Sequence, residues 1–135
     1  DTGVAGQVAG VRFVPRIQAD VFDVTWQKSE RDYSPNTMYR DYAISPTLLN
    51  WESQHAAHRD SQAVKRYVNH ESAGTHILIF ARESKSWEFA SARPFLFLGA
   101  ARYISHSGDR PVTFRWELQR ALPADFFTAS EVLAG

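Results

Sequence analysis

Alternation of hydrophobic and polar residues is the dominant pattern of this chain. It is clearest over residues 112–118, VTFRWEL, and it recurs over residues 22–27 and 49–54. A period of two places alternate side chains on opposite faces of a strand. The short apolar run at residues 77–82, ILIFAR, is typical of a strand buried on both faces, and residues 95–104 predict a longer strand. The pattern therefore predicts a mainly β domain.

Helical signals are shorter and weaker than the strand signals. Ser61 can cap a helix that runs to His70, with its apolar residues on one face. Helical turns are also expected over residues 35–42 and 123–127, both of which open on a proline. Strands joined by short helices predict a small α+β domain. We expect an antiparallel, β-barrel-like sheet with two or three short helices.

Length and composition indicate one globular domain. The chain has 135 residues, of which 44% are hydrophobic and 22% are charged. We expect a single domain over residues 1–135 with an ordered core over about residues 11–130. The opening DTGVAGQVAG resembles a cut inside a longer chain, so we expect the domain to be excised from a larger protein. No apolar run has the length of a membrane span and no leader is visible, so a cytoplasmic location without a membrane partner is expected.

Several classes of cofactor and metal site have no support in the sequence. Cysteine is absent, which excludes disulfides and thiolate zinc sites. The seven glycines do not form a P-loop or a dinucleotide-binding pattern. His55 and His58, with Asp60 nearby, are a candidate zinc group, but no third imidazole or thiolate ligand is fixed by the spacing. We therefore expect no cofactor and no metal.

Catalysis is also weakly supported. The chain has no GxSxG-type nucleophile elbow, and it has no acidic cluster of the kind that a metal-dependent nuclease needs. A small hydrolase that uses a histidine with Asp41 or Glu52 is an alternative. The leading expectation is a domain that is not an enzyme.

The segment 33–54, YSPNTMYRDYAISPTLLNWESQ, is the strongest candidate for a binding site. It mixes aromatic rings with amides and carboxylates. Rings can stack on a planar heterocycle, and amide or carboxylate groups can read its edge. With the helix that follows, the candidate DNA- or base-binding residues are Tyr33, Asn36, Tyr39, Arg40, Asp41, Tyr42, Trp51, Ser53, Gln54, Arg66, Tyr67 and His70. The competing interpretation is that Trp51 and one or two of the tyrosines belong to the core.

The charge of the chain limits how it can bind nucleic acid. The formal net charge is zero, whereas a domain that binds mainly by neutralising phosphates is usually basic. Local basic groups would have to position the DNA, and pocket contacts would have to add the rest. The candidate phosphate-binding groups are Arg59, Lys65 and Arg66 before and within the expected helix, and Arg102, Arg110 and Arg115 around the last hairpin.

Several of these segments also resemble a known family. Residues 33–54, RYVNH (66–70), ILIFARE (77–83), PFLFLGAARYISHSGDRPVTFRWEL (94–118) and LPADFF (122–127) closely resemble a bacterial domain of formerly unknown function. That domain is found at the C-terminus of restriction- or defence-type proteins that combine a phospholipase-D-like nuclease with a DEAD/DEAH-box helicase. The likeness covers about residues 20–128, and the WESQ and GDRP segments make it fairly specific.

The resemblance implies a DNA-handling accessory module, the specificity element of a modification-dependent restriction system. Such systems often use β-barrel readers of the SRA and PUA-like group, so the link to that fold is by analogy. We expect a module that recognises modified DNA, either a modified base or, as the weaker choice, a phosphorothioate backbone. Its partners would then be DNA and a linked nuclease or helicase.

The alternative is a protein-docking module of the helicase or nuclease complex that binds no nucleic acid. Exposed strand edges and the phenylalanines of the tail, Phe126 and Phe127, would then form the interface.

Overall fold

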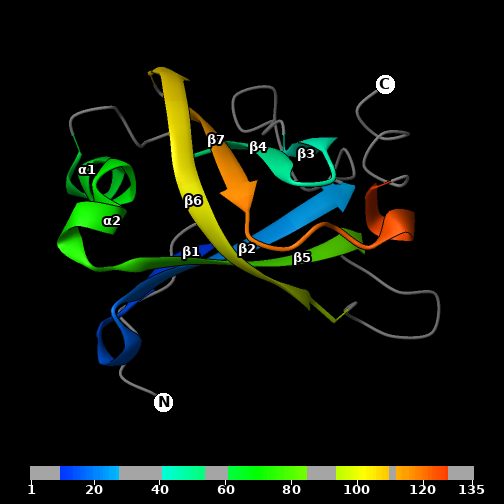
Figure 1. Cartoon of the computed structure of the whole chain (residues 1–135), viewed down its shortest axis with the longest axis horizontal. Helices are drawn as coiled ribbons and strands as arrows, with labels where there is room; N and C mark the ends of the chain where they lie inside the picture. Colours follow the sequence, from blue (N-terminus) through cyan, green and yellow to red (C-terminus); the bar gives the residue numbers. More distant parts are fainter. Residues whose placement is uncertain (1–9, 28–40, 54–60, 85–93, 110–111, 128–135) are drawn as a thin grey trace.

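Strands account for most of the regular structure of the chain. The computed structural model describes residues 10–27, 41–53, 61–84, 94–109 and 112–127. The strands are β1 (Val11–Val14), β2 (Ala19–Gln27), β3 (Tyr42–Ser45), β4 (Leu48–Glu52), β5 (His76–Ser84), β6 (Leu96–Gly108) and β7 (Val112–Leu118). The helices are the 3-10 helix η1 (Pro15–Ile17), α1 (Gln62–Val68) and α2 (His70–Ala73), and residues 124–127 form a further helical turn. The prediction of a mainly β domain with short helices is confirmed (Figure 1).

The strands form one sheet of seven, in the order β1-β2-β5-β6-β7-β4-β3. β2 and β5 are parallel, and the other neighbouring pairs are antiparallel. The parallel pair is possible because two strands and two helices intervene along the chain and bring it back to the same end of the sheet. Closure into a barrel is not seen: among the described residues no pairing joins the edge strands β1 and β3, which have only 4 residues each.

The open sheet nevertheless curls strongly around a core. Phe22 on β2 and Trp51 on β4 have ring centroids only 4.3 Å apart, although β5, β6 and β7 lie between those strands in the sheet. In Figure 1, β1, β2 and β5 lie on one side, β4 and β7 on the other, and β6 crosses between them. The inner face of the sheet therefore encloses an apolar interior, and the outer face remains available for contacts.

The inner face follows the alternation in the sequence. Along β7 the residues at 112, 114, 116 and 118 are buried, and Thr113, Arg115 and Glu117 point outward. Val64 and Tyr67 of α1 complete the core from the helical side. Burial of these rings and aliphatic groups is the main source of stability. Within the part of the chain that is described, no helix has the length and hydropathy of a membrane span.

β6 bends at Gly99, near the start of this strand of 13 residues. The register against β5 shifts between Ile79 and Phe80, next to the pair formed by Ile79 and Gly99. Gly99 has a φ of 103°, a conformation that residues with a Cβ atom rarely adopt. The register shift and this conformation give β6 a bulge next to Gly99, which helps the strand to pass from one side of the core to the other.

Gly99→Ala is expected to lower the free energy of unfolding by about 1–3 kcal/mol, because alanine would be held in a strained backbone conformation. The nearest atoms to the added Cβ belong to the Arg120 guanidinium at 3.5 Å, which is ordinary contact, so the backbone is the source of the cost. Urea unfolding measures the change. Gly74→Ala, at the C-cap of α2, is the comparison: Gly74 has a φ of 76° and no atom within 4 Å of the added Cβ, so this variant measures the cost of an ordinary left-handed conformation, about 1 kcal/mol. Equal stability of Gly99→Ala and the wild type would contradict the strained conformation.

Candidate nucleic-acid interface

The structure separates the residues that the sequence grouped as one binding site. Seven of them lie in described segments: Asp41, Tyr42, Trp51, Ser53, Arg66, Tyr67 and His70. The others lie outside the described residues: Tyr33, Asn36, Tyr39, Arg40 and Gln54. The candidate zinc group of His55, His58 and Asp60 also lies outside them. In the described segments, no group of three or more His, Cys, Asp or Glu side chains could hold a metal ion.

Trp51 and Tyr67 are core residues, which corrects their assignment as DNA- or base-binding residues. Each side chain is only 5% exposed. The Trp51 ring packs on Phe22, and its centroid lies 6.0 Å from that of Tyr67 in an edge-to-face arrangement. Burial, with a smaller effect of Asp20, raises the pKa of the Tyr67 phenol well above its usual range. Neither ring presents a face to a ligand, because β4 and α1 turn both rings into the interior.

Ser53 and His70 also have internal roles. The buried Ser53 hydroxyl accepts a hydrogen bond from the backbone N–H of Val112 at 2.9 Å, which joins the end of β4 to the start of β7. The His70 Nε2 atom accepts from the backbone N–H of Tyr103 at 3.1 Å, and Nδ1 lies 3.3 Å from the carbonyl of Thr75. Because Nε2 accepts a hydrogen bond, Nδ1 is the ring atom that can donate to the Thr75 carbonyl. His70 thereby ties α2 to β6 beside the bulge near Tyr103.

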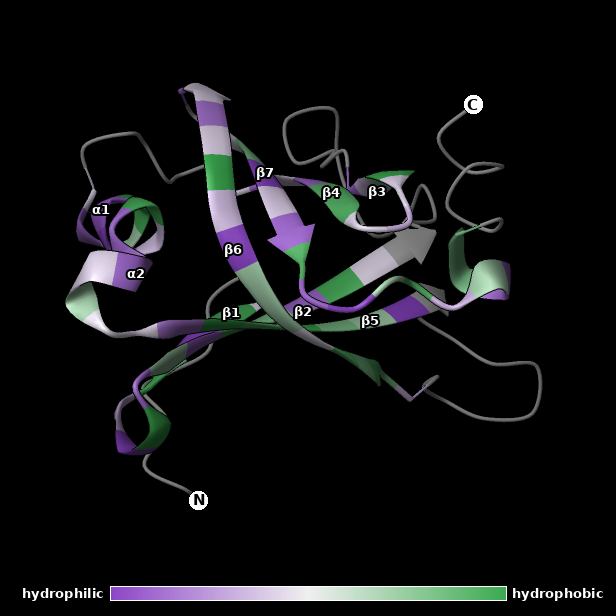
Figure 2. Cartoon of the chain, in the orientation of Figure 1, coloured by the Kyte–Doolittle hydropathy of each residue, from purple (hydrophilic) through white to green (hydrophobic). Residues whose placement is uncertain are grey.

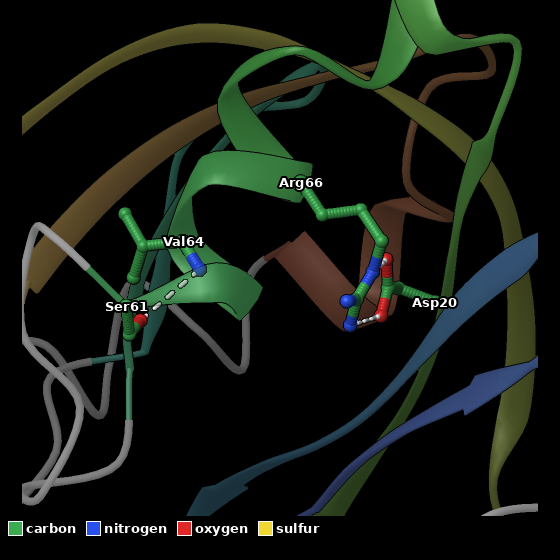
Figure 3. Close-up of polar contacts among 4 residues, drawn as sticks. All are labelled: Asp20, Ser61, Val64 and Arg66. Carbon is green, nitrogen blue, oxygen red and sulfur yellow. Dashed lines mark hydrogen bonds and ion pairs between the residues drawn. The ribbon is translucent and has the colours of Figure 1, made fainter.

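Arg66 anchors α1 to β2. The helix begins at Ser61, whose hydroxyl accepts from the Val64 N–H at 3.3 Å. One turn later, the Arg66 Nε and Nη2 atoms donate to the two carboxylate oxygens of Asp20 at 2.8 and 2.7 Å (Figure 3). The hydrogen bonds to Asp20 raise the pKa of Arg66 above its usual value. The guanidinium also covers the Phe13 ring at 4.6 Å.

This ion pair gives Arg66 a structural role first. The Asp20 carboxylate is fully buried, whereas the Arg66 side chain is 30% exposed. A buried carboxylate needs a hydrogen-bonded cation nearby, and the planar guanidinium provides it with two parallel bonds. The pair was not visible in the sequence, because 46 positions separate its members.

Tyr42 lies elsewhere, on the outer face of the sheet, and Asp41 immediately precedes it at the start of β3. Tyr42 on β3 faces Asn50 on β4, and Asn50 faces Arg115 on β7. Arg115 in turn faces Ser105 on β6. These residues form one row across four strands, and we call Tyr42, Asn50, Arg115 and Ser105 the polar row.

The centre of the polar row is the Arg115 guanidinium. Arg115 is exposed, and its Nε atom lies 3.4 Å from the amide oxygen of Asn50, which is only 4% exposed. The hydrogen bond to this buried amide limits the directions in which the Arg115 guanidinium can point. The exposed Ser105 lies next to Arg115 on β6, and the half-buried Tyr42 lies beyond Asn50 on β3.

A second polar row runs beside the first. Glu52, Thr113 and Ser107 face one another across β4, β7 and β6. The Thr113 hydroxyl donates to a Glu52 carboxylate oxygen at 3.4 Å, and the Asp41 carboxylate accepts from the Glu52 backbone N–H at 3.0 Å. On the other side of the polar row, Arg102 donates to Glu117 at 2.7 and 3.0 Å, which offsets its charge.

This outer face combines cationic, amide, hydroxyl and carboxylate groups on a rigid scaffold. Such groups can contact phosphate oxygens and the edges of bases. Of these residues, Arg115 was a predicted phosphate-binding group, whereas Ser105 and Thr113 were not among the predicted site residues. The alternation along β7 indicates which of its residues face outward, but it does not indicate the register in which β4 pairs with β7.

Two comparisons bear on the family of this chain. A family profile described as "Domain of unknown function (DUF3427)" matches residues 2–129. No curated protein matches the sequence.

Proposed function

The chain belongs to the DUF3427 family, and from that premise we propose that it is a DNA-binding specificity module. In this proposal it recognises modified DNA, with a modified base favoured over a phosphorothioate backbone. It directs a linked nuclease or helicase in bacterial defence, and it is not itself an enzyme.

The observation that carries the proposal is the polar row on the outer face. It places the exposed Arg115 between an ordered amide and a hydroxyl on neighbouring strands. Guanidinium groups bind phosphate or guanine edges, and amides pair with adenine edges. Strands that hold such groups in register can present them to a groove of DNA together.

The neutral charge of the domain is consistent with a reader that discriminates by specific contacts. With a formal net charge of zero, phosphate neutralisation alone would give weak binding. Within the polar row the ring available for stacking is that of Tyr42, since Trp51 and Tyr67 are enclosed. If a base is extruded, the cost of a few kcal/mol has to be offset by stacking and edge contacts of this kind.

Docking through the phenylalanine tail receives less support than DNA binding. Phe126 and Phe127 are half-buried and pack against the hydrophobic core, so they do not form an exposed apolar surface. Their main role is to cover one end of the core.

The proposal is tested by binding to matched duplexes at one stated salt concentration, since affinity for DNA depends strongly on salt. The duplexes contain cytosine, 5-methylcytosine, 5-hydroxymethylcytosine, glucosylated cytosine or a phosphorothioate linkage. Tighter binding to one modification supports the proposal. Equal affinity for all five would remove the claim that the domain reads a modification, and no binding to any would remove DNA recognition.

Arg115→Ala is expected to weaken binding to all duplexes alike and to reduce the salt dependence of the affinity by about one phosphate contact. The measurement is fluorescence anisotropy with labelled duplexes at several salt concentrations. Arg16→Ala is the matched control, because Arg16 is exposed on η1, away from β4 and β7 (Figure 1). If both variants lose the same affinity, the effect is general charge and the polar row has no special role.

A further inference from the structure

A second region of the outer face is aromatic instead of polar. Phe80 on β5 and Phe97 on β6 are direct cross-strand partners, and their ring centroids are 4.8 Å apart at an interplanar angle of 40°. Both point away from the core, because Ile79 and Ala81 on either side of Phe80 are completely buried. Phe97 is 45% exposed, which is unusual for a ring of this size beside a well-packed core.

A cation lies beside this ring pair. Arg82 is the next outward residue of β5 after Phe80, and its guanidinium lies over the Phe95 ring at 4.2 Å. The Arg82 Nε atom also donates to the Thr25 hydroxyl on β2 at 3.1 Å. Stacking and this hydrogen bond hold the guanidinium flat against the sheet, next to the phenylalanines.

The described acidic side chain beside the pair already has a cationic partner. Asp23 on β2 is the neighbour of Phe80 in the sheet, and its carboxylate is held by Arg12 at 2.6 Å. In Figure 2 the first part of β6 is coloured as hydrophobic, in contrast to the mixed colours of its second half beside β7. The outer face is thus divided into the polar row and this aromatic region.

We propose that Phe80 and Phe97 form a stacking platform for the bases of single-stranded nucleic acid, with Arg82 contacting its phosphates. Every base has a π-face, so exposed rings on neighbouring strands bind unpaired bases with little sequence preference. A guanidinium beside the rings supplies the positive charge that the sugar-phosphate backbone needs. This platform deepens the proposed DNA-binding function and rests on it, because it adds contacts to an unpaired strand next to a duplex site.

The charge beside the rings favours a nucleic acid over a protein as the occupant. An apolar protein surface would gain nothing from the Arg82 guanidinium beside the Phe80 and Phe97 rings. Covering that guanidinium would also cost free energy, because the charge would lose its contact with water. A strand of nucleic acid uses both features at once, through its bases and its phosphates.

The test is binding of the full chain to a labelled oligothymidine of about 15 nucleotides, followed by fluorescence anisotropy at low salt. Phe97→Ser is expected to weaken binding about tenfold, which is the effect of losing one stacked base. Phe97→Leu, which keeps an apolar side chain without a ring, should show the same loss. Phe97→Trp, which keeps an aromatic ring, should bind as tightly as the wild type. Ile104→Ser is the control at a similarly exposed hydrophobic residue of the same strand and should leave affinity within about twofold.

The outcomes separate this inference from the proposed function. Loss of oligothymidine binding in Phe97→Ser and Phe97→Leu, with binding to the modified duplex retained, supports the platform. Duplex binding without saturable oligothymidine binding overturns the platform alone, whereas oligothymidine binding without any duplex preference overturns the modification reader alone. The platform is also overturned if the wild-type chain binds no oligothymidine and the Phe97 variants lose binding to a partner domain. That result would assign the patch to protein docking.

Discussion

Trp51→Ala is expected to lower the free energy of unfolding by about 3–5 kcal/mol. The indole packs against Phe22, Tyr67 and Phe114 with centroid distances of 4.3, 6.0 and 5.8 Å, so its removal leaves a cavity between the two sides of the curled sheet. Total stabilities of small domains are about 5–15 kcal/mol, and this loss would bring the protein close to unfolding. Chemical denaturation followed by circular dichroism measures the change.

Trp51→Phe is the matched control. It keeps a ring in the same place and should cost less than the alanine variant, because the cavity is smaller. A stacking role for Trp51 would give the opposite pattern: Trp51→Ala would keep the stability of the wild type and lose affinity for DNA. That result would return Trp51 to the binding site and contradict the inward orientation of β4.

Arg66→Met is expected to lower the free energy of unfolding by about 3–5 kcal/mol, the second large effect. The variant removes both hydrogen bonds from the Asp20 carboxylate, which is fully buried and would be left as a charge without its cation. The methionine side chain still covers part of Phe13, so the main cost is electrostatic. Thermal and denaturant unfolding at neutral pH measure it.

A double variant separates the ion pair from simple packing. Asp20→Leu combined with Arg66→Met removes both charges, and it should recover much of the stability lost in Arg66→Met. Arg102→Met is the surface control, since it breaks the exposed pair with Glu117 and should leave the unfolding transition unchanged. If Arg66→Met behaves like Arg102→Met, then Asp20 is not held by Arg66 in solution.

Much of the fold was predictable because β propensity and period-two alternation are local signals. Residues 112–118 form β7 with the predicted buried face, and the expected helix after Ser61 is present as α1 followed by α2. The edge strands β1 and β3 were not predicted, since each has 4 residues and too few alternations to stand out. The curl of the sheet depends on bulges and on register between distant strands, which no local pattern encodes.

The candidate site was harder to predict, for a physical reason that Trp51 illustrates. Aromatic and polar residues occur together in binding sites, and they also occur together in any strand that has one face packed on the core and the other exposed to solvent. The alternation of Leu49 and Trp51 with Asn50 and Glu52 was the better guide, because it places the indole on the apolar face. The pairs Asp20–Arg66 and Asn50–Arg115 join residues 46 and 65 positions apart, so only the assembled sheet brings them together.

The central claim is that the outer face of β3, β4, β7 and β6 binds DNA. Backbone amide chemical shifts of the isotope-labelled protein, recorded during titration with the preferred modified duplex, test it most directly. The account predicts that the largest changes fall on Tyr42, Asn50, Ser105 and Arg115. Saturable binding with the changes confined to α1, β1 and β2, or no change at all with excess duplex, would contradict it.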